Sequence, residues 1–136
     1  METAVVLPVF MMVLTGIYTF GIAYNNKIML TNATTVAAQR LQQLRTSTSD
    51  PCLDTYNALL AAAPTLDSSK VTMSFTLAGT TFGSYTGSAI TCTSGANYLT
   101  VGSTFTVSAY YPCTISAYAF STSSCQLSAT VSEYEY

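Results

Sequence analysis

The beginning of the chain is apolar on every side and is headed by one carboxylate. Residues 3–26 contain no charged side chain, residues 4–24 are strongly apolar, and Glu2 stands in front of them. About 20 helical residues, at a rise of 1.5 Å each, cover the roughly 30 Å hydrocarbon core of a bilayer. The pattern therefore predicts a membrane-spanning helix over 1–24.

After residue 24 the pattern becomes amphipathic without a break. Apolar residues recur from Leu30 to Leu44 at helical spacing, and Gln and Arg residues lie between them. We predict one helix from about residue 2 to about residue 47, roughly 70 Å long at 1.5 Å per residue. Its first part would lie in a membrane or filament core, and the amphipathic part, 25–49, would dock on a globular head.

The remaining residues, 50–136, alternate between strand and turn patterns behind one short helix. Asp50 and Pro51 suit the cap and first turn of a helix that ends before Pro64. GTTFGSYTG, residues 79–87, predicts a turn or wide hairpin loop, and Pro112 is expected to end a strand. The expected strands cover 71–77, 90–93, 98–110 and 126–136. The fold class is therefore α+β: a long helix, then a small antiparallel sheet with a short helix.

Four cysteines, all after residue 50, indicate an exported head. No two of them form a CxxC pair and the chain has no His, so a zinc site is not expected. An even number in a small domain predicts two disulfides in an oxidising compartment. Of the three possible pairings we favour Cys52–Cys92, which would tie the helix to the sheet, with Cys113–Cys125, which would close a short loop.

Charge is scarce, which excludes several classes of function. The chain has 4 Lys and Arg, 6 Asp and Glu, and a net charge of −2, whereas nucleic-acid binding needs clustered cations. Without His or a Gly-rich phosphate loop, little is left to catalyse a reaction, so we expect neither an enzyme nor a cofactor. The pairs Asp50 with Asp54 and Glu133 with Glu135 supply too few oxygens for Ca²⁺, so no metal is expected.

Three small or rigid residues interrupt the apolar helix. Pro8 lies more than a turn inside it, where it removes one backbone hydrogen bond and should kink or locally melt the helix. Gly16 and Gly21 would allow another apolar helix to approach closely. The alternative is that Gly and Pro are merely tolerated in membrane helices.

These features occur together in a known family. The order E-TAVVLP-VFMMVLTG-IYTFG, followed by LTNATTVAAQRL, resembles the N-terminus of TadE-like pilins of the tight-adherence, type IV-like pilus systems. Near the other end, TFTVSAYYPC and CQLSATVSEYE resemble the late β-hairpin of that family, with Tyr111-Pro112 as its corner and Glu133 or Glu135 as its terminal acid. The resemblance covers roughly residues 1–45 and 98–136.

The resemblance implies a structural pilin that polymerises through its N-terminal helix into an extracellular filament used in surface attachment. Glu2 would pair with the free α-amino group of a neighbouring copy, a group that a prepilin peptidase exposes when it removes a basic leader. Further partners would be the inner membrane before assembly and the pilus assembly machinery. Glu2, Pro8, Gly16 and Gly21 are the expected assembly residues. The alternatives are a minor pilin-like assembly factor and a membrane-anchored binding domain that never polymerises.

Overall fold

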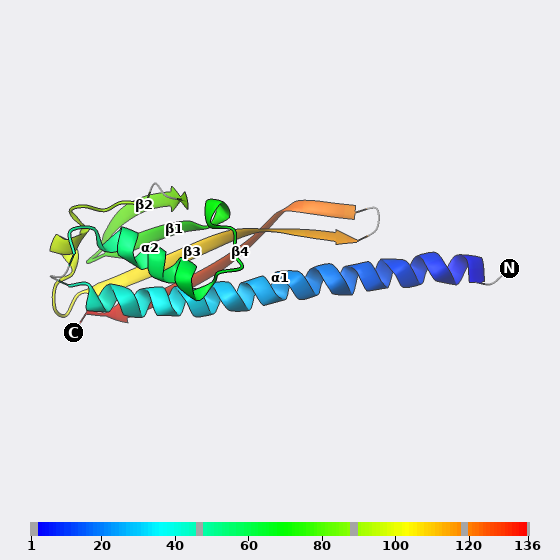
Figure 1. The fold of residues 1–136 in the computed structure, drawn as a ribbon, viewed down its shortest axis with the longest axis horizontal. Coiled ribbons are helices and arrows are strands. Elements are labelled where there is room, and N and C mark those ends of the chain that lie inside the picture. Colours follow the sequence, from blue (N-terminus) through cyan, green and yellow to red (C-terminus); the bar gives the residue numbers. More distant parts are fainter. Residues whose placement is uncertain (1–2, 46–47, 88–89, 118–119, 136) are drawn as a thin grey trace.

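The computed structural model describes residues 3–45, 48–87, 90–117 and 120–135, and has one long helix lying across one face of a sheet (Figure 1). The N-terminal part of this helix projects well beyond the head, whereas its C-terminal part is covered by the sheet and by a second helix. The helices are α1 (Thr3–Gln43) and α2 (Pro51–Ala62), with short 3₁₀ turns at Ser68–Lys70 and Gly95–Tyr98. The strands are β1 (Thr72–Leu77), β2 (Thr80–Thr86), β3 (Thr104–Ala117) and β4 (Phe120–Tyr134).

The four strands form one antiparallel sheet in the order β2-β1-β3-β4. This confirms the α+β class and the long apolar helix. The helix ends at Gln43, a few residues before the expected end.

One face of α1 forms half of the hydrophobic core. Leu30 and Leu41 have no exposed surface, and small Ala side chains between them bring the helix close to the sheet. The hydroxyl of Thr34, also buried, donates to the carbonyl oxygen of Leu30 at 2.6 Å, so burying it leaves no unpaired polar group. The opposing core residues include Phe75, Phe105, Val107, Ala109 and Ala129. The amphipathic pattern predicted for this half is therefore confirmed.

The free edge of β4 is bonded to α1 at two points. Lys27 donates its ammonium to the carbonyl oxygen of Ser128, and Gln42 donates Nε2 to the carbonyl oxygen of Tyr134 at 3.1 Å. Unpaired edge groups are a template for aggregation unless something covers them. The long helix thus protects the edge strand as well as the core.

The outer face of the sheet is a set of paired hydroxyl groups. Across β1 and β2, Oγ1 of Thr72 lies 2.9 Å from Oγ1 of Thr86. Across β3 and β4, Oγ of Ser108 lies 3.1 Å from Oγ1 of Thr130. No charged residue occurs between Lys70 and Glu133 in the sequence. This face is therefore polar but uncharged.

The prediction of a turn or wide hairpin loop over 79–87 is wrong, because these residues contain β2. Ala78 and Gly79 have φ values of 48° and 80° and form the two-residue turn that joins Leu77 to Thr80. Two positive φ values suit the right-handed twist of a hairpin. Asn or Asp normally stands at the first of these positions, so Ala78 concealed the turn.

Two further strand predictions are wrong. Residues 90–93 form no strand: the structure holds Cys92 there through its disulfide with Cys52 and through a 3.0 Å hydrogen bond from its N–H to Asp50 Oδ1. The third strand begins at Thr104 rather than at residue 98, because the 3₁₀ turn Gly95–Tyr98 precedes it.

Pro112 does not end β3, which continues to Ala117. The carbonyl of Ser128 points away from β3 toward Lys27, and Ser128 lies opposite Tyr110. Pro112 is two residues beyond Tyr110, so its nitrogen also points away from β4. On that side β1 no longer pairs with β3, because the first residue of β1, Thr72, lies opposite Tyr110. A proline is tolerated where no ladder hydrogen bond is needed from its nitrogen. Because β3 continues past Pro112, β4 has a partner from Phe120 onward and begins there, earlier than the expected residue 126.

Asp50 anchors α2 as the N-cap that the sequence predicted. Its Oδ1 accepts hydrogen bonds from the N–H groups of Leu53, at 3.1 Å, and Cys92. Gly95 backs onto the same disulfide: a Cβ there would lie 2.6 Å from the sulfur of Cys92. One carboxylate, one disulfide and one glycine thus fix the loop before β3 against α2.

The structure pairs the cysteines as Cys52–Cys92 and Cys113–Cys125, the pairing favoured above. We expect no free thiol in the exported protein, and each bond should stabilise the fold by about 2–4 kcal/mol. Thiol labelling under denaturing, non-reducing conditions measures this directly. Labelling of two thiols per chain would contradict the assignment to an oxidising compartment.

Glu135 is a buried carboxylate at the end of the sheet. Its side chain is 2% exposed, and neither oxygen has a hydrogen-bond partner among the described residues. Burial raises the pKa of Glu135, and the charge of Arg45 opposes that rise. Because folding favours the protonated form, its contribution to stability is present at low pH and is lost as the pH rises through the folded-state pKa.

We therefore expect Glu135→Gln to raise the thermal unfolding midpoint at pH 7, with a gain on the order of 1 kcal/mol. The gain should disappear in acid, below the ordinary pKa of a glutamate. Glu133→Gln, on the neighbouring, less buried acid, is the matched control. A gain of equal size at all pH values would show that the charge of Glu135 is not its cause.

Candidate functional site

The N-terminal half of α1 exposes an apolar surface that the rest of the described chain leaves largely uncovered. Tyr18 is 70% exposed and Ile17 66%, which is unusual for side chains of this size. The large apolar side chains exposed on this part of the helix are Val6, Leu7, Val9, Phe10, Met11, Met12, Val13, Leu14, Ile17, Tyr18, Phe20, Ile22 and Tyr24. A contiguous patch of this kind marks a site of contact with a membrane or another protein.

By length and composition, α1 can cross a membrane. Its most apolar part has a mean hydropathy of 2.0 and is almost entirely unburied. The hydroxyl groups of its two threonines bond to the backbone of the same helix. Thr15 donates to the carbonyl oxygen of Met11 at 2.9 Å, and Thr19 donates to the carbonyl oxygen of Thr15 at 3.0 Å. This segment therefore exposes almost no unpaired polar group to an apolar neighbour.

Gly16 and Gly21 lie in open space. No described atom lies within 4 Å of the position that a Cβ would occupy on either residue, so nothing inside the chain requires glycine there. At about 100° per residue the two glycines are separated by roughly 140° around the helix. The two glycines thus lie on different faces of the same helix, so each could contact a different neighbouring helix.

The structure places Pro8 inside a continuous helix. α1 keeps its helical conformation on both sides of Pro8, so the local melting expected there is absent from the single chain. Glu2, the other expected assembly residue, lies outside the described residues.

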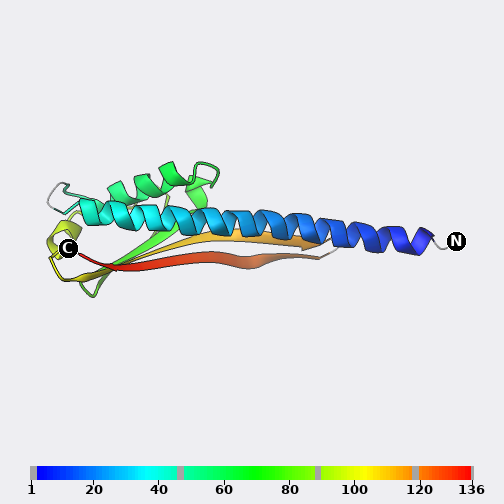
Figure 2. The same cartoon turned by 90° about the horizontal axis from the view of Figure 1, so that it is seen from below.

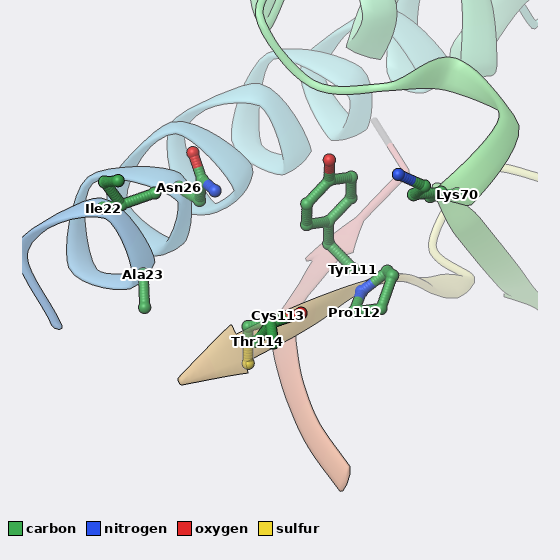
Figure 3. Close-up of a pocket in the computed structure, with 8 residues that line it drawn as sticks. All are labelled: Ile22, Ala23, Asn26, Lys70, Tyr111, Pro112, Cys113 and Thr114. Atoms are coloured by element: carbon green, nitrogen blue, oxygen red, sulfur yellow. The ribbon is translucent and has the colours of Figure 1, made fainter. Parts of the chain in front are cut away.

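A cleft that we did not predict from the sequence lies between α1 and β3. It has a volume of about 360 Å³ and, as Figure 3 shows, separates Ile22, Ala23 and Asn26 of α1 from residues 111–114. Sequence reasoning missed this cleft because it forms only if β3 continues past Pro112.

Lys70 closes one end of the cleft. Its ammonium lies 3.2 Å from Oδ2 of Asp67, and the N–H of Asp67 donates to the hydroxyl of Tyr111 at 3.4 Å. Hydrogen bonds from Ser69 and Lys70 lower the pKa of Asp67. These charges are largely neutralised by one another, so the cleft has no strong charge with which to select an ion.

No group of three or more metal-ligating side chains occurs among the described residues. Asp50 caps α2, as described above, and Asp54 lies in the first turn of that helix. What the described part of the chain offers is an apolar contact surface, with two open glycines on it.

Comparison with known proteins bears on this helix. Residues 1–39 match the family model of the TadE-like proteins, which spans the exposed apolar half of α1 and part of its buried half. The match does not extend to 98–136, where the sequence also resembled that family. No curated protein and no solved structure matches the chain. Over residues 1–39 the chain is therefore similar to the TadE-like proteins, which supports the resemblance seen in its N-terminal sequence.

Proposed function

We propose that this chain is a structural pilin subunit, without enzymatic activity, that polymerises through α1 into an extracellular type IV-like filament for surface attachment. The observation that carries the proposal is the exposed apolar half of α1, which is headed by an acid and joined without a break to a disulfide-bonded head. Before assembly this half would lie in the inner membrane. In the filament, copies of the same helix would replace the lipid.

Packing between helices, rather than the exclusion of water, must make the filament more stable than the membrane-inserted chain. Keeping an apolar side chain from water is worth roughly 1.5–3 kcal/mol, but moving it from lipid to protein gains almost nothing. Close approach of helices at Gly16 and Gly21 can supply the difference, since both are open in the single chain. Glu2 would add a pair with the α-amino group of a neighbouring copy, and that group would come from cleavage by a prepilin peptidase.

Two other functions would use the same helix. A minor pilin-like factor would prime or cap a fibre made of another subunit, and would be rare in purified filaments. A membrane-anchored binding domain would remain monomeric after detergent extraction. Electron microscopy of sheared cell-surface material, with mass spectrometry of the fibre subunit, separates these possibilities.

Gly16→Leu should reduce fibre yield by roughly tenfold or more, the equivalent of about 1.4 kcal/mol per subunit contact. The leucine would hold neighbouring helices apart, yet it meets no described atom of its own chain. Expression, membrane insertion and disulfides should be unchanged. Ile17→Leu, at an exposed position and with the same volume, is the matched control and should assemble normally.

Glu2→Ala should likewise lower the fibre yield without loss of the membrane-inserted subunit, because it removes the proposed partner of the α-amino group. Yield is measured by shearing cells and quantifying the subunit in the fibre fraction. Wild-type yield from both Glu2→Ala and Gly16→Leu would refute polymerisation through α1 and favour the anchored monomer.

Around Pro8, we expect the helix to open on assembly, although it is continuous in the single chain. Proline supplies no N–H to the helix, so the turn before it is the least costly to unwind. In a well-resolved filament map, residues 5–8 should depart from α geometry. A continuous hydrogen-bonded helix from Val5 to Phe10 in the filament would contradict this.

A further inference from the structure

The β3–β4 hairpin extends beyond the rest of the sheet toward the N-terminal end of α1 (Figure 2). β1 pairs with β3 only as far as Tyr110, so in residues 111–117 and 120–127 β3 and β4 pair only with each other among the described strands. We call these residues the overhang. The disulfide Cys113–Cys125 joins its two strands, so they must move as one unit.

The overhang lies beside the apolar half of α1. The contact between Lys27 and Ser128 fixes the level of the strand pair, because Ser128 lies opposite Tyr110. From Tyr110 to Ser116, six residues at about 3.3 Å cover about 20 Å, which equals about 13 residues of helix. The end of the overhang therefore lies beside about residue 14 of α1. Both ribbon views show the hairpin running alongside this helix toward its N-terminal end.

This arrangement conflicts with a full membrane span. If residues 4–24 were in hydrocarbon, the side of α1 that faces the overhang would have to contact lipid over about residues 14–24. With the overhang in place, only residues 3–14 are free on all sides. Twelve helical residues cover about 18 Å, well short of the roughly 30 Å hydrocarbon core.

The overhang itself is unsuited to hydrocarbon. Among the described residues, each of its strands pairs with another strand on one side only, so alternate peptide groups along both outer edges have no described strand to bond with. Open sheet edges do not occur in the hydrocarbon region, because nothing there satisfies the backbone. The overhang cannot simply follow α1 into the bilayer.

The contact between the overhang and α1 is loose enough to separate. The cleft of about 360 Å³ lies between them, and Ile22 on its wall remains 46% exposed. Beyond Tyr110 the overhang has lost the support of β1, and Pro112 contributes no N–H to a ladder. Tyr110 and Pro112 therefore mark the place where the overhang can bend away from α1.

We propose that the overhang lies off α1 while the chain spans a bilayer and docks on α1, as in this structure, once the helix leaves the lipid. The side of α1 that faces the overhang, over about residues 14–24, then has two alternative partners: acyl chains in the membrane and its own hairpin outside it. The other sides of the helix stay exposed for contact with neighbouring copies. The inference rests on the membrane stage of the proposed function. It adds that leaving the membrane changes the fold of the subunit as well as its location.

Tryptophan fluorescence tests this, since the chain contains no Trp of its own. Single reporters are placed at Tyr18→Trp on α1 and Ser121→Trp near the end of the overhang, where both side chains are exposed and lie at similar levels. Ser84→Trp, on an exposed position of β2, is the matched control. Each full-length variant is reconstituted in phosphatidylcholine vesicles that contain lipids brominated in the acyl chains.

We expect these lipids to quench most of the emission of Tyr18→Trp, and to quench Ser121→Trp no more than Ser84→Trp. Equal quenching of Tyr18→Trp and Ser121→Trp would overturn the proposal, because the overhang would then enter the bilayer. If Tyr18→Trp is not quenched, the proposal is also overturned, and a reporter at Val9→Trp shows why. Quenching at Val9 means that the docked overhang limits insertion; its absence means that the membrane stage itself fails.

Discussion

The contact between the buried face of α1 and the sheet determines the rest of the structure. Leu30, Ala33, Ala37 and Leu41 close the core of the head, so one helix is a core element of the head and also extends well beyond it. Because the helix is continuous, any force on its free half is transmitted rigidly to the head. The continuous helix thus joins the exposed apolar half directly to the head, with no linker between them in the described residues.

The same helix also covers part of the open edge of β4, the long strand at one side of the sheet. β4 is fifteen residues long and would be open along one side, yet side chains of α1 take two of its carbonyl groups. At the other edge of the sheet, β2 has 7 residues against 15 in β4, so less edge is open there. The sheet therefore stays single even though charge, the usual deterrent to strand pairing, is missing from all four strands before Glu133.

The sequence predicted what depends on local pattern and missed what depends on neighbours. The apolar half of α1, its buried face, the cap at Asp50 and β1 are all set by periodicity or by one residue's hydrogen bonds. β2 was missed because Ala78 occupies a turn position that Asn or Gly usually holds. The extension of β3 was missed because the effect of Pro112 depends on where β1 ends, and the sequence alone does not state this.

The candidate site divides in the same way. Gly16 and Gly21 are open because they lie in the half of α1 that the described head leaves largely uncovered, and their five-residue spacing places them on different faces of the helix. The cleft beside Ala23 required knowledge of the overhang. The burial of Glu135 could not be foreseen, since alternation within β4 does not show that the residue after it bonds to the backbone of Gly102 and Ser103 and lies near Arg45.

The uncharged outer face of the sheet has a consequence for how heads can crowd together. Its hydroxyl groups are bonded in pairs, such as Thr106 with Ser132 at 2.8 Å, so each strand satisfies its neighbour without counter-ions. Screening by salt acts only on charges, and there are none on this face for it to act on. Any contact made through this face would therefore contain no charge–charge interaction for salt to weaken.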